Sequence, residues 1–311
     1  MSMPLFSGRA AAGGGPTSEP SALLQLEGVR WVIDRGLPSE RTVLGGIDLT
    51  IREGERVGIA GRSGSGKTTL VTILAGLLDP SAGRLLFRGR RVESADERPF
   101  RSEIGFVFQE PESAFFEETV LDDVAFAVRN AGFAPDEARV RATAALRAVG
   151  LDPAAFGPRL PESLSGGEAR RAGIAGALVL TPRFVFFDEP TAGLDAEGIA
   201  RFRALLATLR AAGTGYALIS HELPLLAAEC ERILVLAGGR IAWDGPAHAL
   251  AAGAPPGWPP EVSAPADALL EIAHGLRERG LLDPAVPATP EALAAVLAEK
   301  RFGNGSHSGA G

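Results

Sequence analysis

Lysine is almost absent from this sequence. Lys and Arg together number 31, and since only Lys67 and Lys300 are lysine, the other 29 are arginine. The two side chains are not interchangeable, because an ammonium is a compact point charge and a guanidinium is a broad planar fork. We therefore expect Lys67 to serve a purpose that arginine cannot, and we expect no such purpose for Lys300 near the end of the chain.

Cysteine, long apolar runs and excess positive charge are also missing. The single cysteine, Cys230, excludes an internal disulfide and a Cys-based zinc cluster. No run reaches the ~18 apolar residues of a membrane span, since the longest candidate, 172–180, is interrupted by glycines. A formal charge of −7 argues against a surface that binds nucleic acid generally.

Composition divides the 311 residues into a folded region and two ends. Residues 1–20 are rich in Gly, Ala, Ser and Pro and lack the apolar core of a signal peptide, so we expect a disordered leader. Residues 21–250 form one predicted domain, and Pro and Gly cluster at 252–260, where the domain ends. Residues 251–301 predict a small C-terminal helical extension, and 302–311 a flexible tail.

Short apolar runs alternate with helical patterns, which predicts an α/β fold with a mostly parallel sheet and flanking helices. The predicted strands lie at 23–26, 47–51, 57–60, 84–87, 104–108, 184–187, 216–220 and 233–236. The predicted helices lie at 67–78, 136–149, 166–180, 196–211, 266–279 and 290–300.

A glycine-rich loop follows the third predicted strand. It reads Gly61-Arg62-Ser63-Gly64-Ser65-Gly66-Lys67-Thr68 and fits G-x-x-x-x-G-K-[ST], with a helical pattern continuing from Thr69. Such glycines let backbone N–H groups converge on phosphate oxygens, and the helix start adds partial positive charge. We therefore expect Lys67 to reach the β- and γ-phosphates of a nucleotide and the Thr68 hydroxyl to ligate Mg²⁺.

A second chemical signal is the apolar run at 184–187, which ends in Asp188 and Glu189. A buried strand can deliver Asp188 beside the loop to hold Mg²⁺ and Glu189 to deprotonate an attacking water. Taken alone, the same residues fit a strand that ends in a solvated acidic turn.

A GTPase of the usual type is disfavoured, because its guanine-reading motif needs Lys after Asn and neither lysine follows an Asn.

A third signal is the helix start Leu164-Ser165-Gly166-Gly167-Glu168. Its first turn offers unpaired N–H groups, no bulky side chains and a hydroxyl, as an anion-binding helix start would. Alone, it also fits an ordinary capping box formed by Ser165 and Glu168. With the phosphate loop, the sequence has two helix starts suited to binding phosphate, which is one more than a single nucleotide needs.

Together these motifs resemble the ATP-binding cassette ATPases, and the match covers about residues 23–246. Besides the three signals above, it rests on Gln109 after the strand at 104–108, Gly193-Leu194-Asp195 and Ser220-His221-Glu222, all in the family's order. The resemblance implies a phosphate-loop (RecA-like) core with a mixed sheet, a helical subdomain at about 110–180, and a head-to-tail pair of cassettes. Each ATP would lie between one phosphate loop and the partner's signature helix.

The resemblance also assigns roles. The phosphate loop with Thr69, and Ser165, Gly166 and Gly167 from the partner, would bind ATP. Gln109 would touch Mg²⁺ together with Thr68 and Asp188. Catalysis would depend on Lys67, Gln109, Glu189 as general base and His221 at the γ-phosphate, while Asp195 would communicate across the dimer. Glu168 stands where the family more often has Gln.

The residue that stacks on adenine is left open. Ile33 stands where the family has Tyr, and the single tyrosine is Tyr216. Trp31 lies two residues before Ile33, on the same strand face if the strand is regular. It fits a stacking platform or a core position equally well.

The segment 106–132 is similar to the ATPases of energy-coupling factor and cobalt-type importers, although Ala114 stands where Gln is usual. The pattern at 276–297 resembles the C-terminal extension of that group. This implies an ATPase on the cytoplasmic face of the membrane that powers uptake of a vitamin or transition-metal ion. Its first partner would be a second cassette, either the same chain or a paralogue. The others would be a transmembrane coupling subunit and a substrate-binding membrane subunit, and residues 109–126 of this chain would form the groove that receives the coupling helices of the former.

The alternatives are another class of ABC transporter, or a soluble cassette acting on nucleic acid or ribosomes. Between Lys67 and Asp188 there are no sustained heptads, so the coiled coil of chromosome-maintenance cassettes is missing. One cysteine cannot supply the zinc sites of excision-repair cassettes, and one cassette is not the fused pair of the ribosomal type. A catalytically idle cassette is disfavoured because Lys67, Asp188, Glu189 and His221 are all present.

Overall fold

The structure is a computed structural model. It describes residues 21–93, 98–110, 115–252 and 255–259, and six single positions beyond them: Val262, Arg277, Gly280, Leu282, Asp283 and Val286. The chain divides into two compact units, one made of residues 1–55 and 68–219 and the other of 56–67 and 220–311. Among the described residues, no helix is long and apolar enough to cross a membrane.

The first unit contains an antiparallel sheet with the strand order β2-β1-β4-β5. Apolar side chains on β1 and β2 turn inward, because strands with one buried face alternate apolar and polar residues. The register of β1 with β2 shifts several times, once between Trp31 and Val32, so side chains on either side of that shift do not keep a regular alternation. The strands are β1 (Ala22–Ile33), β2 (Arg41–Arg52), β4 (Ala82–Phe87) and β5 (Arg90–Arg91).

Three parallel strands of the first unit pair in the order β8-β7-β6. They are β6 (Ile104–Val107), β7 (Phe184–Asp188) and β8 (Gly215–Ile219). Every residue of β7 and β8 is buried, as expected for parallel strands that are covered on both faces and read as continuous apolar runs. Asp188 therefore ends a strand that has no solvated face.

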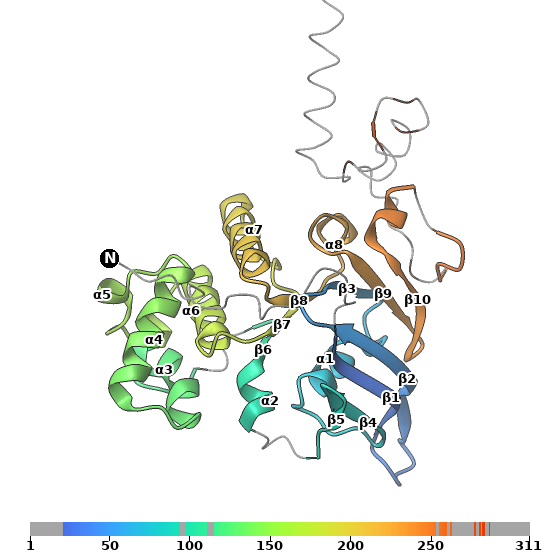
Figure 1. Ribbon diagram of the computed structural model, residues 1–311, viewed down its shortest axis with the longest axis horizontal. Coiled ribbons are helices and arrows are strands. Elements are labelled where there is room, and N and C mark those ends of the chain that lie inside the picture. The colour runs from blue at the N-terminus through green and yellow to red at the C-terminus, as the bar shows by residue number, and fades with distance from the viewer. Residues whose placement is uncertain are drawn as a thin grey trace, which may run out of the picture. The chain divides into compact units, whose positions relative to one another are not determined.

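Helices complete the first unit. The cluster α3–α6, in green tones in Figure 1, packs together through α3, α4 and α6. Thr119, Asp152 and Asp195 cap α3, α5 and α7 with side-chain oxygens, as N-cap residues do. The elements are α1 (Lys67–Leu74), α2 (Arg98–Glu103), α3 (Val120–Asn130), α4 (Pro135–Ala148), α5 (Pro153–Phe156), the 3₁₀ turn η2 (Pro161–Ser163), α6 (Gly166–Leu178) and α7 (Ala196–Ala211).

The second unit is built on β3 (Arg56–Gly61), which pairs in parallel with β9 (Arg232–Ala237). β10 (Arg240–Pro246) pairs with β9 as an antiparallel hairpin. Helix α8 (Leu223–Glu229) contacts β3 and the 3₁₀ turn η3 (Ala247–Ala252). β3 leads directly into the phosphate loop, so its buried apolar residues fix where that loop begins.

Strands occur at all eight predicted positions, and helices at four of the six. The predicted helices at 266–279 and 290–300 lie outside the described residues, apart from single positions. The sequence patterns named no individual helix between 109 and 135 and no strand after 236, where the structure has α3 and β10. The leader at 1–20 and the tail at 302–311 also lie outside the described residues.

Candidate functional site

The phosphate loop bends back sharply after β3. Gly61, Gly64 and Gly66 have φ values of +148°, +77° and +102°, which L side chains rarely adopt. A Cβ atom at Gly61 would lie 2.5 Å from the Leu236 carbonyl oxygen and 2.7 Å from Ser65 Oγ. The first glycine of the motif is therefore required both by its backbone conformation and by the close approach of β9.

Lys67 lies at the end of the phosphate loop, and its ammonium bonds back to the start of the loop. Nζ donates to Gly61 O at 2.8 Å and to Arg62 O at 3.1 Å, and the side chain is 7% exposed. Ser65 is 8% exposed, and its Oγ is buried without a hydrogen-bond partner. A buried hydroxyl without a partner is costly, so the loop has a hydrogen-bonding group that the described residues do not satisfy.

Thr68 and Asp188, which are 120 positions apart, meet in the first unit. Thr68 Oγ1 donates to Asp188 Oδ2 at 3.0 Å. Asp188 is 5% exposed, and it is held by the end of β7. A hydroxyl oxygen and a carboxylate oxygen at this separation are hard ligands of the kind that Mg²⁺ prefers, and the structure thus brings together two of the three predicted metal ligands.

Glu189 follows Asp188 at the point where β7 stops. Its backbone N–H donates to Ile219 O of β8 at 2.9 Å, which keeps the residue at the sheet edge. Its φ is +46°, a left-handed conformation that is uncommon for residues other than glycine. Because of this turn, the Glu189 side chain does not point where it would if β7 continued. Glu189 is half-buried.

The signature segment forms the start of α6. Glu168 Oε2 accepts from Ser165 N at 2.8 Å, so the capping interaction considered for the sequence is present. This backbone hydrogen bond, followed by one from the Ser165 hydroxyl, lowers the pKa of Glu168 below its usual value. A lowered pKa means that the interaction stabilises the fold above the unfolded pKa and is lost as the pH falls through the folded pKa.

Gly166 and Gly167 are not required by the packing of this chain. A Cβ on Gly166 would meet nothing within 4 Å, and one on Gly167 would meet only Arg171 Nη1, at 3.7 Å. Neither residue has a positive φ. The backbone of the first turn of α6 is thus open, and packing among the described residues does not require glycine at either position.

The starts of α6 and α7 face a common groove of about 450 Å³. Gly166, Gly167 and Asp195 line it, together with arginine side chains of both helices. Asp195 is exposed, and its Oδ1 caps α7 by accepting from Gly198 N at 2.7 Å. The structure therefore brings Asp195 next to the signature segment.

Arg170 connects three segments of the candidate site, and the sequence did not single it out. Nη2 donates to Gln109 O at 2.9 Å, and Nη1 donates to Pro190 O at 3.3 Å and to Ala192 O. One guanidinium on α6 thus holds the backbone after β6 and the backbone after β7. No short motif could have shown this, because all three acceptors are main-chain carbonyls that only the fold brings together.

The remaining predicted residues lie on segments other than those that carry Thr68 and Asp188. The Gln109 side chain is exposed, and within the described residues it makes no hydrogen bond to Thr68 or Asp188. His221 is exposed and follows Ser220 in the second unit. Trp31 is half-buried on β1, where the register shift breaks regular alternation, and Tyr216 is fully buried in β8. Tyr216 therefore has no surface to offer a base.

Comparison with known proteins agrees with this geometry. Residues 44–192 match the family model described as ABC transporter. The energy-coupling factor transporter ATP-binding protein EcfA2 of Symbiobacterium thermophilum is 39% identical over 284 residues, 87% of this chain and 94% of that protein. The cobalt import ATP-binding protein CbiO of Syntrophus aciditrophicus is 39% identical over 66% of this chain and 72% of its own.

Solved structures give the same result. CbiO1 from Clostridium perfringens, described as part of the ABC transporter complex CbiONQ, superposes with a TM-score of 0.66 at 29% identity, covering 84% of this chain and 98% of its own. A dimeric ATP-binding cassette in a post-hydrolysis state bound to ADP and Pi gives a TM-score of 0.65 at 28% identity, covering 72% and 99%. The predicted α/β cassette fold is confirmed.

Fold and motifs first define a phosphate-loop ATPase. The chain belongs to the ATP-binding proteins of ABC transporters, in the group of the energy-coupling factor and cobalt import ATPases. It binds ATP and is the ATP-hydrolysing subunit of an importer of the energy-coupling factor type.

Proposed function

We propose that two cassettes, either two copies of this chain or this chain and a paralogue, bind two ATP molecules in composite sites. Each site would join the phosphate loop of one cassette to the signature segment of the other. The observation that carries this proposal is the open space at Gly166 and Gly167, which the chain's own packing does not explain. A dimeric relative bound to ADP and Pi supports the same arrangement.

On the phosphate-loop side, we assign the ATP phosphates to the backbone N–H groups of residues 61–69. Lys67 would exchange its contacts with the Gly61 and Arg62 carbonyl oxygens for the β- and γ-phosphates, and the Ser65 hydroxyl would gain a partner that it lacks in the structure. Because the Ser65 hydroxyl gains a partner and ATP binds the folded loop, ATP binding would stabilise the loop.

Thr68 and Asp188 fit a Mg²⁺ ion, because their two oxygens are 3.0 Å apart and one belongs to a buried carboxylate. Gln109, exposed on the segment that Arg170 holds, would complete the set of protein ligands. Bound Mg²⁺ supplies charge that offsets the negative phosphate oxygens.

Hydrolysis would use Glu189 as the general base. Its carboxylate would take a proton from a water that attacks the γ-phosphorus, the bond from that phosphorus to the bridging oxygen would break, and ADP and inorganic phosphate would form. We assign His221 to the γ-phosphate, and Asp195, which lines the same groove as Gly166 and Gly167, to contacts across the dimer. The adenine-stacking role of Trp31 stays a hypothesis.

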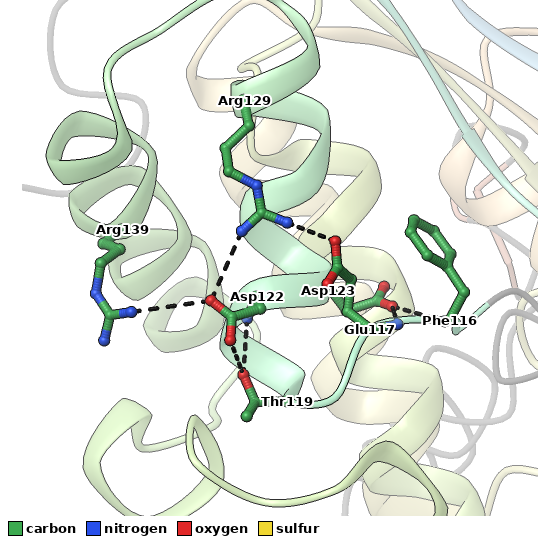
Figure 2. Close-up of polar contacts among 7 residues, drawn as sticks. All are labelled: Phe116, Glu117, Thr119, Asp122, Asp123, Arg129 and Arg139. Atoms are coloured by element: carbon green, nitrogen blue, oxygen red, sulfur yellow. Dashed lines mark hydrogen bonds and ion pairs between the residues drawn. The ribbon is translucent and has the colours of Figure 1, made fainter.

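A transmembrane subunit would bind on the surface at the start of α3. Phe116 is 64% exposed and packs edge-to-face on Phe126, which is 40% exposed, with ring centroids 4.6 Å apart. Asp123 Oδ2 fixes the backbone there by accepting from Phe116 N at 2.9 Å and Glu117 N at 3.1 Å (Figure 2). Exposed paired aromatics on an ordered support are typical of a protein interface.

This surface belongs to α3, and α3 packs on α6. We therefore propose that the cluster α3–α6 is the helical subdomain expected at about 110–180 and that it transmits movement of the signature helix to the membrane subunit. The chain would lie on the cytoplasmic face of the membrane, with a substrate-binding membrane subunit as a third partner. A vitamin or a transition-metal ion is the proposed cargo, in keeping with the cobalt import relative.

The test is turnover by Glu189→Gln. Gln keeps the shape of the side chain but cannot accept the proton, so we expect the ATPase rate of the purified chain or complex to fall by ~10²–10⁴-fold. ATP binding should be retained, and size-exclusion chromatography with ATP should show the variant as a stable dimer. Glu197→Gln, on an exposed carboxylate of α7, is the matched control. Wild-type turnover by Glu189→Gln would refute the assignment.

A further inference from the structure

A second pocket extends along α6 and α7 from the groove at their first turns, with which it shares Gly167, Leu194 and Gly198. Its volume is about 300 Å³, within the range of ~300–1,000 Å³ of small-molecule sites. Ile174 of α6 and Phe202 and Leu205 of α7 line it with apolar and aromatic surface, and the last turn of α4 closes it with Arg147. No residue of the phosphate loop is part of it.

The charge of this pocket is one-sided. Four arginines line it, two from α6, one from α7 and one from α4, and no Asp or Glu is among its described lining residues. Arg170 is committed to three carbonyl oxygens, and Arg201 forms an exposed ion pair with Glu197 at 3.0 Å. Positive charge is therefore concentrated beside an apolar surface.

Two of the arginines retain unmet donors. The Arg147 side chain is exposed and forms no hydrogen bond or ion pair with any described residue. The Nε atom of Arg171 is buried and has no hydrogen-bond partner. A buried donor without a partner is costly, so the guanidinium of Arg171, which lines the pocket, is not fully satisfied by the described residues.

We propose that this pocket binds a small amphipathic anion: an apolar or aromatic body that carries one carboxylate, sulfonate or phosphate ester group. The body would pack on Ile174, Phe202 and Leu205, and the anionic group would meet the guanidinium groups of Arg147 and Arg171. Charge-assisted hydrogen bonds to a planar guanidinium fork suit such a group. This ligand goes beyond the nucleotides and partners proposed above.

Occupancy would affect the ATPase through geometry. The pocket is bounded by three helices, and α6 begins with the signature segment while α7 is capped by Asp195. A ligand that contacts all three would favour one arrangement of these helices over others. The pocket is therefore a regulatory site for the cassette.

The test is direct binding of a matched pair of probes to the full chain without nucleotide, measured by isothermal titration calorimetry. Naphthalene-2-sulfonate carries the anion and the aromatic body, whereas naphthalene-2-sulfonamide keeps the body and is neutral. We expect one sulfonate per chain and at least about tenfold weaker binding of the sulfonamide, because the charge-assisted hydrogen bonds are lost.

Four variants locate the probe. Arg147→Gln and Arg171→Gln should each weaken sulfonate binding about tenfold, and Ala204→Phe, which adds a ring at an exposed lining position, should block it. Arg210→Gln is the matched control, because Arg210 lies on α7, is exposed and does not line the pocket. Thermal denaturation shows whether each variant is folded. If Arg147→Gln is not folded, the result for Arg171→Gln decides, and the reverse also holds.

Three results would overturn the proposal: no saturable sulfonate binding, equal binding of the neutral sulfonamide, or an equal loss in Arg210→Gln. A fourth would be loss of binding in Lys67→Ala, which would assign the probe to the nucleotide site. Because binding is measured without ATP, an inactive ATPase would refute the proposed function and leave this test intact.

Discussion

Lys67 shows how a single residue can be fixed by the geometry of its acceptors. Its ammonium bonds to two carbonyl oxygens of one tight loop and is 7% exposed. A compact ammonium can pivot between these oxygens and phosphate oxygens, whereas a guanidinium is broader and presents its donors in one plane. This accounts for a lysine at this position in a chain that otherwise uses arginine.

Lys67→Arg should therefore impair the enzyme although the charge is kept. We expect kcat to fall by about 10²-fold, the effect of losing one well-placed donor to developing charge, with weaker ATP binding as well. Steady-state ATPase assays and binding of a fluorescent ATP analogue measure the two effects. Lys300→Arg is the control and should match the wild type. Equal kcat/KM for both variants would contradict this account.

Arg170 acts on the site through the backbone. It joins α6 to Gln109 O on one side and to Pro190 O and Ala192 O on the other, so it positions the segments that carry the proposed metal ligand and the general base. Removing it leaves three carbonyl oxygens without this donor and frees both segments.

Arg170→Ala should lower kcat by about tenfold or more while changing KM for ATP little, because the phosphate loop is untouched. Arg170→Lys, which can bond to fewer carbonyls at once, should recover part of the loss. Arg210→Ala on α7 is the control for loss of an exposed arginine. If Arg170→Ala raises KM alone, the side chain contributes to ATP binding and not to positioning.

At the scale of elements, the sequence predicted helices and strands best where the spacing of apolar residues follows a single period. Helix α7 has the predicted bounds, and β7 is the apolar run ending in Asp188. Helix α3 was missed although its signals are present: Thr119 precedes it, and Val120, Val124 and Val128 recur every four residues and are buried. The signals in this segment are mixed, because exposed Phe126 interrupts the polar face that an amphipathic helix usually shows.

The start of α3 depends on Thr119. Its Oγ1 accepts from Asp122 N at 3.1 Å and donates to Asp122 Oδ2 at 2.6 Å (Figure 2). Two arginines extend this arrangement, since Arg129 lies 3.6 Å and Arg139 3.8 Å from Asp122 Oδ1. These ion pairs are partly exposed and contribute little each, so the cap is the main local term.

Thr119→Ala should lower the free energy of unfolding by about 1 kcal/mol, the usual effect of removing an N-cap side chain. Chemical denaturation of the purified chain measures it. Thr208→Ala, within α7 and exposed, should change stability little or raise it slightly, because alanine favours helix and no cap is lost. Equal destabilisation by the two variants would show that the Thr119 cap is not specific.

At the scale of the whole molecule, the sequence predicted the class of protein more fully than the arrangement of its site. Thr68 with Asp188, and Gly166 and Gly167 with Asp195, lie together in the first unit. The role of Arg170 and the pocket at Arg147 depend on packing between segments far apart in sequence, which no local pattern encodes. The proposed second half of each ATP site lies on another chain, so one chain's motifs can indicate it but not display it.

Association with the membrane subunit should depend on the aromatic pair at the start of α3. Phe116→Ala removes the more exposed ring, so we expect about tenfold or greater loss of affinity for the transmembrane partner, as for an aromatic residue at the centre of an interface. Co-purification and titration in detergent measure the loss. Val140→Ala, which removes a 69% exposed apolar side chain from α4, is the control. Equal effects of both would move the interface elsewhere.

The scarcity of lysine has a consequence for chemical labelling of the chain. Amine-reactive dyes need an accessible, deprotonated amine, and the Lys67 amine is held against two carbonyl oxygens and is almost fully covered. Lys300 and the α-amino group are the other amines that the sequence offers. A fluorophore ester can therefore mark the protein while sparing the phosphate loop, and any label found on Lys67 reports that the loop has opened.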